Sequence, residues 1–167
     1  MADSIQFHGQ EKITQWLNRA IAELKDPRPL FSEIGAILEF NTKQRINDGV
    51  GVDDRPWVQS WRARIQGGTT LRDTSRLYNS ITSRVSSDGK NVSIGTNVIY
   101  APLMHFGGII RPKNGKFLIF KTPLGGWVKL KSVTIKPRPY LGVSVDDSQE
   151  ILTTIEEYLD KALRDAE

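Results

Sequence analysis

The chain has 167 residues and a formal net charge of +4, with 38% hydrophobic residues, 25% charged residues and no cysteine. These values exclude wholesale disorder, disulfide bonds, thiolate nucleophiles and cysteine metal sites, and the length predicts a single domain over residues 1–167. No apolar run approaches the ~20 residues of a membrane helix and the polar start lacks a signal segment, so we expect synthesis in a cytoplasm and no membrane partner.

The N-terminal part of the chain predicts two amphipathic helices. Apolar residues recur at three- and four-residue spacing over residues 13–24, and prolines then break the chain. A second apolar stripe predicts a helix over residues 30–47, which ends before two glycines. We expect both helices to pack on a sheet, and we expect residues 1–10 to form a flexible N-terminus.

Residues 53–70 combine Trp57 and Trp61 with polar residues and glycines in no clear period, which predicts a long loop. Long loops in compact domains are often functional or mobile, and tryptophan is often an interface anchor. A spacing of four residues also fits one helical turn that covers the core. Trp57 and Trp61 are therefore candidates for an interface or for the core.

Residues 71–80 predict a short helix, and the residues that follow them predict a hairpin. Residues on both sides of a Ser-Ser-Asp-Gly turn alternate between apolar and polar over residues 81–94. A short helical turn around residues 100–106 closes on a pair of glycines. This order of elements places a helix, a hairpin and a helical turn one after another.

The last part predicts a second hairpin and a final helix. Strand-like segments at residues 117–120 and 127–130 flank a Pro-Leu-Gly-Gly turn, and residues 133–135 continue the second strand. Apolar residues from Ile151 to Ala162 form one face of a C-terminal helix with an acidic first turn. Together the elements predict an α+β fold, in which an antiparallel sheet of about four strands packs with N-terminal helices and a C-terminal helix.

Acidic and basic residues are segregated in the second half of the chain. Residues 89–145 contain no Asp or Glu and nine basic residues, whereas residues 146–167 contain eight acidic and two basic residues. Opposite charge on different faces favours head-to-tail contacts between subunits. An acidic helix that covers a basic sheet within one chain is equally consistent with the pattern. The candidate contact residues are Lys129, Lys131, Glu156 and Glu157.

The turn of the second hairpin carries an apolar residue, Leu124, between lysines and ahead of Trp127. A turn that only connects strands is more often short and polar, so we expect this hairpin to be an arm that contacts a partner ring or tube. The alternative is that Leu124 and Trp127 fold back onto their own sheet. The candidate contact residues of the arm are Lys116, Lys121, Leu124 and Trp127.

The sequence offers little for catalysis or for a cofactor. His8 and His105 are the only histidines, and no acid, base or metal ligand clusters around them. The paired glycines lack the spacing and the lysine of a nucleotide cradle. We therefore predict a protein that is not an enzyme and has no metal or cofactor.

Contact with nucleic acid is the stronger alternative. The acid-free stretch combines lysines with Tyr100, Phe117, Phe120 and Trp127, the residue types of a surface that contacts phosphates and stacks on bases. No helix rich in Arg, Asn and Gln stands out, so sequence-specific recognition is not expected. A basic sheet face that contacts DNA without reading its sequence stays open.

Three separated segments carry the most specific signal in the chain. They read LRDTSRLYNSI at residues 71–81, IGTNVIYAPLMHFGG at residues 94–108 and KPRPYLG at residues 136–142. Their order and wording resemble the phage virion morphogenesis family, the tail-completion or neck proteins of Mu-like and other tailed bacteriophages. The resemblance covers residues 30–165 and includes Trp57, whereas Ser75 stands where the family pattern has glycine.

The resemblance implies a structural virion protein that completes the tail or joins the tail to the head as a ring in the neck. The implied partners are further copies of the chain, with a hexamer as one option, and neighbouring tail-tube, tail-terminator or head-connector proteins. The implied location is the neck or tail end of the virion, after assembly in a bacterial cytoplasm. Non-specific contact with packaged DNA is the alternative, and a hydrolase of lysis or DNA ejection comes third.

Overall fold

The computed structural model describes residues 10–164, so His8 and most of the expected flexible N-terminus lie outside the described residues. The chain forms two compact units from interleaved segments. Among the described residues, the first unit contains residues 10–42, 81–95 and 141–164, and the second unit contains residues 43–80 and 96–140. That the chain folds as one domain stays a prediction.

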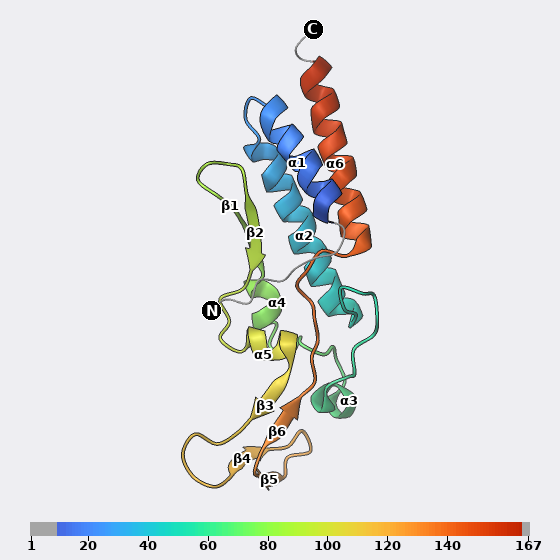
Figure 1. The fold of residues 1–167 in the computed structure, drawn as a ribbon. Coiled ribbons are helices and arrows are strands. Elements are labelled where there is room, and N and C mark those ends of the chain that lie inside the picture. Colours follow the sequence, from blue (N-terminus) through green and yellow to red (C-terminus); the bar gives the residue numbers. More distant parts are fainter. Residues whose placement is uncertain (1–9, 165–167) are drawn as a thin grey trace. The chain divides into compact units, whose positions relative to one another are not determined.

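The first unit packs helices and one hairpin around an apolar core (Figure 1). Its helices are α1 (Gln10–Glu23), the first part of α2 (Arg28–Asp48) and α6 (Val145–Arg164), and its hairpin pairs β1 (Thr82–Val85) with β2 (Val92–Gly95). The apolar stripes of α1 and α6 face each other, as their spacing requires. The buried core consists of Ala20, Leu30, Ile34, Leu38, Ile151, Ile155 and Leu159.

Helix α2 lies close to the β1–β2 hairpin because Gly35 has no side chain. A Cβ at Gly35 would lie 2.9 Å from Ser83 Oγ and 2.9 Å from Val92 Cγ2. The helix begins two residues before the expected start, since Pro29 is tolerated in a first turn that needs no donor. It ends at Asp48, and the next residue, Gly49, has a φ of +72° that favours glycine. The expected packing of α2 on strands is therefore present in this unit.

The second unit contains short elements joined by ordered loops. These elements are the helices α3 (Trp61–Gln66), α4 (Arg76–Ser80) and α5 (Ala101–Phe106), the strand pair β3 (Gly108–Ile110) with β6 (Val133–Ile135), and the strand pair β4 (Leu118–Lys121) with β5 (Trp127–Leu130). Its buried apolar residues are Ile46, Ala63, Leu77, Val98, Ala101 and Tyr140. No helix within residues 10–164 is long and apolar enough to cross a membrane.

The α+β class with antiparallel pairing is confirmed, but the strands are arranged differently from the expectation. Six short strands form three two-stranded sheets among the described residues, where one sheet of about four strands was expected. Strand β6 does not continue β5 and instead pairs with β3, a strand that the sequence did not indicate. This strand has only three residues and begins with a glycine, so alternation could not reveal it.

Two further differences arise from local backbone conformation. Helix α4 covers only residues 76–80 of the expected 71–80, because Leu71 and Ser75 have φ values of +67° and +57°, outside the helical region. Helix α3 occupies part of the expected loop over residues 53–70. It starts there because Ser60 Oγ accepts a hydrogen bond from the Ala63 amide at 3.2 Å.

Candidate functional site

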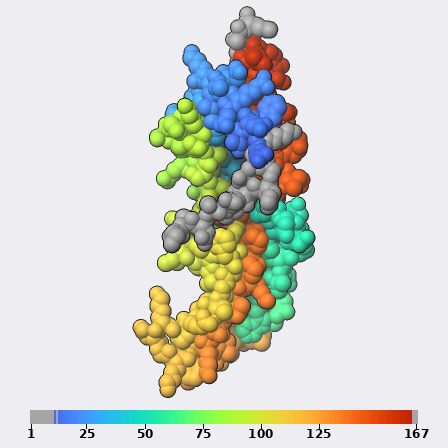
Figure 2. Space-filling model, in the orientation of Figure 1, coloured from blue at the N-terminus to red at the C-terminus, as the bar shows by residue number. Residues whose placement is uncertain are grey.

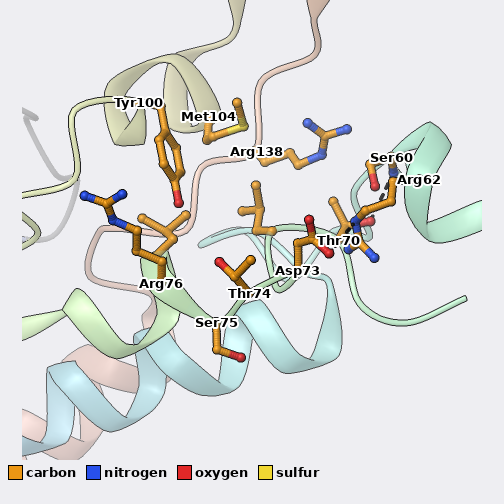
Figure 3. A pocket seen from close by; sticks show the side chains of 12 residues that line it. Ser60, Arg62, Thr70, Asp73, Thr74, Ser75, Arg76, Tyr100, Met104 and Arg138 are labelled. Atoms are coloured by element: carbon orange, nitrogen blue, oxygen red, sulfur yellow. Dashed lines mark hydrogen bonds and ion pairs between the residues drawn. The ribbon is translucent and has the colours of Figure 1, made fainter. Parts of the chain in front are cut away.

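The three sequence signatures meet around one cavity in the second unit (Figure 3). Its volume is about 300 Å³. The first signature contributes every residue from Leu71 to Leu77 except Arg72. The second signature contributes Tyr100 and Met104, and the third contributes Arg138. Ser60, Arg62 and Thr70 complete the wall. The cavity is therefore the place where segments far apart in the sequence act together.

The third signature holds the second signature in place through hydrogen bonds. The Arg138 amide donates to the carbonyl oxygens of Met104 at 3.1 Å and His105 at 3.0 Å, which lie in the last turn of α5. The Tyr140 hydroxyl donates to the Ala101 carbonyl at 3.3 Å. Burial raises the pKa of Tyr140 to about 12, so this hydroxyl remains a donor at neutral pH.

Gly107 allows the two signatures to approach this closely. Its φ is +72°, and a Cβ at this position would lie 2.8 Å from the Ile135 carbonyl oxygen and 2.8 Å from the Pro137 nitrogen. Any other residue would displace backbone atoms, because distances below 3.0 Å are not tolerated there. The positive φ and the close approach of the backbone at residues 135 and 137 therefore account for this glycine.

Positive charge surrounds the cavity and is only partly compensated. The buried Arg138 guanidinium donates to the Val58 carbonyl through Nε at 3.3 Å and Nη2 at 3.1 Å, and to the Lys136 carbonyl through Nη1 at 3.3 Å. These partners are neutral, and burial lowers the pKa of Arg138. Arg62 Nη2 donates to the Thr69 carbonyl at 2.7 Å.

Asp73 supplies the carboxylate of the cavity wall. Its Oδ1 lies 3.5 Å from Arg62 Nε, and the Asp73 side chain is 69% exposed. Arg76 is exposed and forms no hydrogen bond or ion pair with another residue of the described part of the chain, and Figure 3 shows it beside Tyr100, away from Arg62. Arg62, Arg76 and Arg138 all line the cavity, whereas Asp73 is the one carboxylate of the lining, and this excess of positive charge favours an anionic occupant.

The remaining wall is apolar or strained. Leu71, Leu77, Tyr100 and Met104 supply apolar surface. Leu71 and Ser75 have left-handed backbone conformations, which cost about 1–2 kcal/mol each for residues with a Cβ. Ser75 is the position where the sequence resemblance indicates glycine, so the departure in sequence coincides with a backbone that suits glycine. The cavity was not predicted from the sequence. The departure from the family pattern at Ser75 is the one feature of the sequence that pointed to it.

The lining residues do not form a catalytic set. His105 is not among them, and its ring packs edge-on against Phe106 and Tyr140, with centroid distances of 4.5 Å and 5.2 Å. Burial lowers the pKa of His105, so its neutral form predominates at neutral pH. Within residues 10–164 no group of three or more His, Asp or Glu side chains could hold a metal ion. The arrangement is suited to binding.

The expected arm is a hairpin with an exposed tip. Leu124 is 73% exposed and Trp127 is 70% exposed, so neither folds back onto its own strands. The Thr122 amide donates to the Gly126 carbonyl at 2.7 Å, which closes the turn, and Gly125 has a φ of +89°. Figure 2 shows the surface of this segment in yellow to orange. The tip therefore presents large apolar side chains to solvent.

Strand register gathers candidate residues on one face of the hairpin. Ile119 pairs with Lys129 and Lys121 pairs with Trp127, so these four side chains lie on the same face. All four are exposed, with Ile119 at 64%. Lys129 Nζ also lies 4.3 Å from the centroid of the Phe117 ring, within the range of a cation–π contact. The flanking candidates Lys116 and Lys131 are exposed.

The other candidate residues lie in different surroundings. Trp61 is 43% exposed at the start of α3, whereas Trp57 is partly buried, and its buried Nε1 has no hydrogen-bond partner within the described part of the chain. Gln66 Nε2 at the end of α3 donates to the Pro123 carbonyl at 3.0 Å, so α3 contacts the hairpin turn. Glu156 and Glu157 are exposed on α6.

Comparisons with known proteins identify the family. The model of the phage virion morphogenesis family matches residues 9–160. The chain is 29% identical over 155 residues to the Mu-like prophage FluMu G protein 2 of Haemophilus influenzae, with 92% of this chain and 94% of that protein covered. No solved structure matches the chain. The family match spans most of the described residues and includes all three signatures, and the chain belongs to the phage virion morphogenesis family.

Proposed function

We propose that this protein is a structural, non-enzymatic part of a tailed phage virion that completes the tail or joins the tail to the head. In this role it forms a ring in the neck through contacts between copies, and it meets neighbouring tail-tube, tail-terminator or head-connector proteins. Family membership supports a role in virion morphogenesis. The finer role is carried by one observation, the exposed tip and face of the β4–β5 hairpin.

The exposed face of the β4–β5 hairpin has the composition of a protein–protein interface. The face and the tip of the hairpin expose more than half of each of three large apolar side chains, those of Trp127, Leu124 and Ile119. Exposure of apolar side chains to water is unfavourable. Tryptophan is enriched at protein interfaces, where burial of such a side chain contributes ~2 kcal/mol. Repetition of this contribution around a ring would stabilise the assembly without any change in the subunit core.

The experiment is a double change, Leu124→Ser with Trp127→Ser, in the full chain. The melting temperature of the free subunit is measured, and tailed particles are counted after the variant replaces the wild-type protein during phage growth. We expect unchanged melting and about a tenfold loss of tailed particles or more, since each lost apolar contact is worth about 2 kcal/mol. Both side chains are exposed, so the subunit should fold.

The matched control changes two apolar residues outside the hairpin that are even more exposed than Leu124 and Trp127. Ile99→Ser with Val145→Ser removes side chains that are 94% and 84% exposed. This control should leave both melting and particle counts near wild type. A large fall in the melting temperature of the hairpin variant, or normal numbers of tailed particles, would contradict the proposed arm.

DNA contact is the second candidate function, because Lys121 and Lys129 are exposed on the same face as Trp127. Such a face could contact phosphates and stack on bases without reading sequence. Binding of a duplex DNA fragment should then weaken steeply as salt is raised, and Lys121→Ala with Lys129→Ala should reduce that salt dependence. No DNA binding at low salt would exclude this candidate.

A further inference from the structure

We propose that the cavity lined by the three signatures receives the exposed end of α6 from a second copy of this chain. In this contact Leu163 occupies the apolar part of the cavity and Asp160 lies beside its arginines. The inference rests on the proposed ring, because it names the contact through which one copy holds the next. It also names an occupant of the cavity, which neither membership of the family nor the similarity to the prophage protein indicates.

The lining of the cavity suits an occupant with both an apolar and an anionic part. Arg138 is a buried cation whose guanidinium contacts only carbonyl oxygens within the described residues. Arg62 and Arg76 add further positive charge, and Asp73 is the single carboxylate of the lining. A small inorganic anion would leave the apolar wall unused. A leucine next to a carboxylate satisfies both parts.

Helix α6 offers such a pair at its exposed end. Leu163 is 58% exposed and lies one turn after Asp160, while Glu156 lies one turn before it. Residues spaced by four and three positions share one side of a helix, so an acidic stripe ends in an apolar residue. The opposite side of α6 is buried against α1 and α2, which leaves this stripe available to another molecule.

The neighbouring charges on α6 are compatible with this contact. Lys161 and Arg164 lie on adjacent rows of the helix, and Arg164 Nε donates to the Asp160 carbonyl at 3.2 Å. The segment from residue 146 onward still contains more acidic than basic residues. The complementary signs of the cavity and the helix therefore favour their association.

A contact of this type can close into a ring. The cavity belongs to the second unit and α6 belongs to the first unit, so every copy carries both partner surfaces. Contacts between two different patches are heterologous, and they form rings when the rotation between copies closes. The same contact would order the copies head to tail.

The absence of cysteine provides a direct test by cross-linking. A full-length variant with Thr74→Cys at the cavity and Leu163→Cys on α6 is oxidised and run on a non-reducing gel. A disulfide forms only when the two Cα atoms approach within about 7 Å. We expect a ladder of dimers and larger species, at least about tenfold above the control, as a contact of 1.4 kcal/mol or more requires.

The matched control pairs Thr74→Cys with Glu23→Cys, which places the second cysteine on the exposed surface of α1. Equal ladders from both pairs would overturn the inference, as would a cross-link that forms within one chain. A ladder absent from both pairs, while the wild-type protein sediments as an oligomer, would reject the cavity contact and leave the ring. A wild-type protein that sediments as a monomer at every concentration, even with tail components, would reject the ring itself.

Charge exchange gives a second, independent readout. Arg76→Glu and Asp160→Arg should each reduce tailed particles about tenfold, because each loses attraction worth roughly 1.4 kcal/mol. Both changes in one chain should restore the particles, since every contact in the ring again pairs opposite charges. Arg84→Glu on β1, an exposed arginine outside the cavity, is the control and should have no effect. Restoration of Asp160→Arg by Lys129→Glu instead would overturn the cavity assignment.

Discussion

Ser144 and Asp147 cap the N-terminus of α6 reciprocally. Ser144 Oγ accepts a hydrogen bond from the Asp147 amide at 3.0 Å, and Asp147 Oδ2 accepts one from the Ser144 amide at 2.7 Å. Asp147 Oδ1 also accepts a hydrogen bond from Asn41 Nδ2 at 2.9 Å, which connects the cap to α2. The cap therefore fixes where α6 begins, and with it the position of every acidic residue on the exposed side of the helix.

The first prediction concerns this cap. Asp147→Ala removes a carboxylate that is 1% exposed and leaves the buried Ser144 amide without its acceptor. We expect the free energy of unfolding, measured by urea denaturation, to fall by about 2–4 kcal/mol, from the lost cap and the unsatisfied donor.

Asp146→Ala is the matched control, because Asp146 is exposed in the same helical turn. Its loss should cost only about 0.3–1 kcal/mol, the interaction of an exposed carboxylate with the helix dipole. Equal destabilisation by the two changes would show that charge near the helix end, and not the reciprocal cap, stabilises α6.

The second prediction is that Ser75→Gly stabilises the protein. Ser75 has a φ of +57°, so glycine relieves about 1–2 kcal/mol of strain while it costs about 0.5–1 kcal/mol in chain entropy. The contact from Arg72 Nε to Ser75 Oγ is long, at 3.4 Å, and exposed. We expect a net gain of about 0.5–1 kcal/mol in urea denaturation.

Asn79→Gly provides the contrast for Ser75→Gly. Asn79 lies in α4, where glycine gains nothing from its freedom and lowers helix stability by a few tenths of a kcal/mol. A loss of stability for Ser75→Gly, similar to that of Asn79→Gly, would show that the Ser75 hydroxyl contributes more than its backbone costs.

The elements that could be predicted from the sequence are those with a local, repeating signal. The stripes of α1, α2 and α6 and the alternation of β1 and β2 satisfy this condition. The pairing of β3 with β6 joins residues 108–110 to residues 133–135, and no local period encodes that contact. The predictable part of the fold is therefore the part whose contacts follow from sequence spacing.

The cavity could not be predicted, although each signature was recognised. Its wall depends on the left-handed backbone at Leu71 and Ser75, and on the close approach that Gly107 permits. The exposed hairpin tip was predictable because its signal, an apolar residue in a turn, is local. A single sequence does not show which residues of different segments contact each other in the folded chain.

The third prediction concerns His105 and pH. Burial lowers the pKa of His105, whereas the unfolded chain binds a proton near the ordinary value of about 6.5. The unfolded state therefore binds more protons below that value, and stability falls as the pH falls from about 6.5 toward the lowered pKa. His105→Gln should flatten this part of the profile in thermal melts between pH 7.5 and pH 5.

The same variant tests whether the protein is an enzyme. His105→Gln should retain tailed particles near wild-type numbers at neutral pH, because its ring packs against Phe106 and Tyr140 and does not line the cavity. If the variant melted normally but produced no tailed particles, a chemical role for His105 would replace the structural one.

The last prediction concerns the acidic side of α6. Glu156→Lys with Glu157→Lys reverses two exposed carboxylates and should change the free energy of unfolding by no more than about 0.5 kcal/mol. The change should nevertheless reduce tailed particles about tenfold, because it opposes the attraction between this stripe and a basic surface of the next copy. Glu11→Lys with Glu23→Lys on α1 changes the net charge equally and should leave the particles unaffected.

The partner of these carboxylates can be identified by compensation. The charge pattern of the sequence pairs them with Lys129 and Lys131, whereas the arginines of the cavity offer a site that combines charge with an apolar wall. We expect Arg76→Glu to restore part of the assembly of the Glu156→Lys and Glu157→Lys variant, and Lys129→Glu with Lys131→Glu to restore none. Normal particle numbers for the α6 variant at physiological salt would show that electrostatic attraction does not contribute to the contact. Screening by salt would not explain that result, because a screening length of about 8 Å leaves adjacent charges coupled.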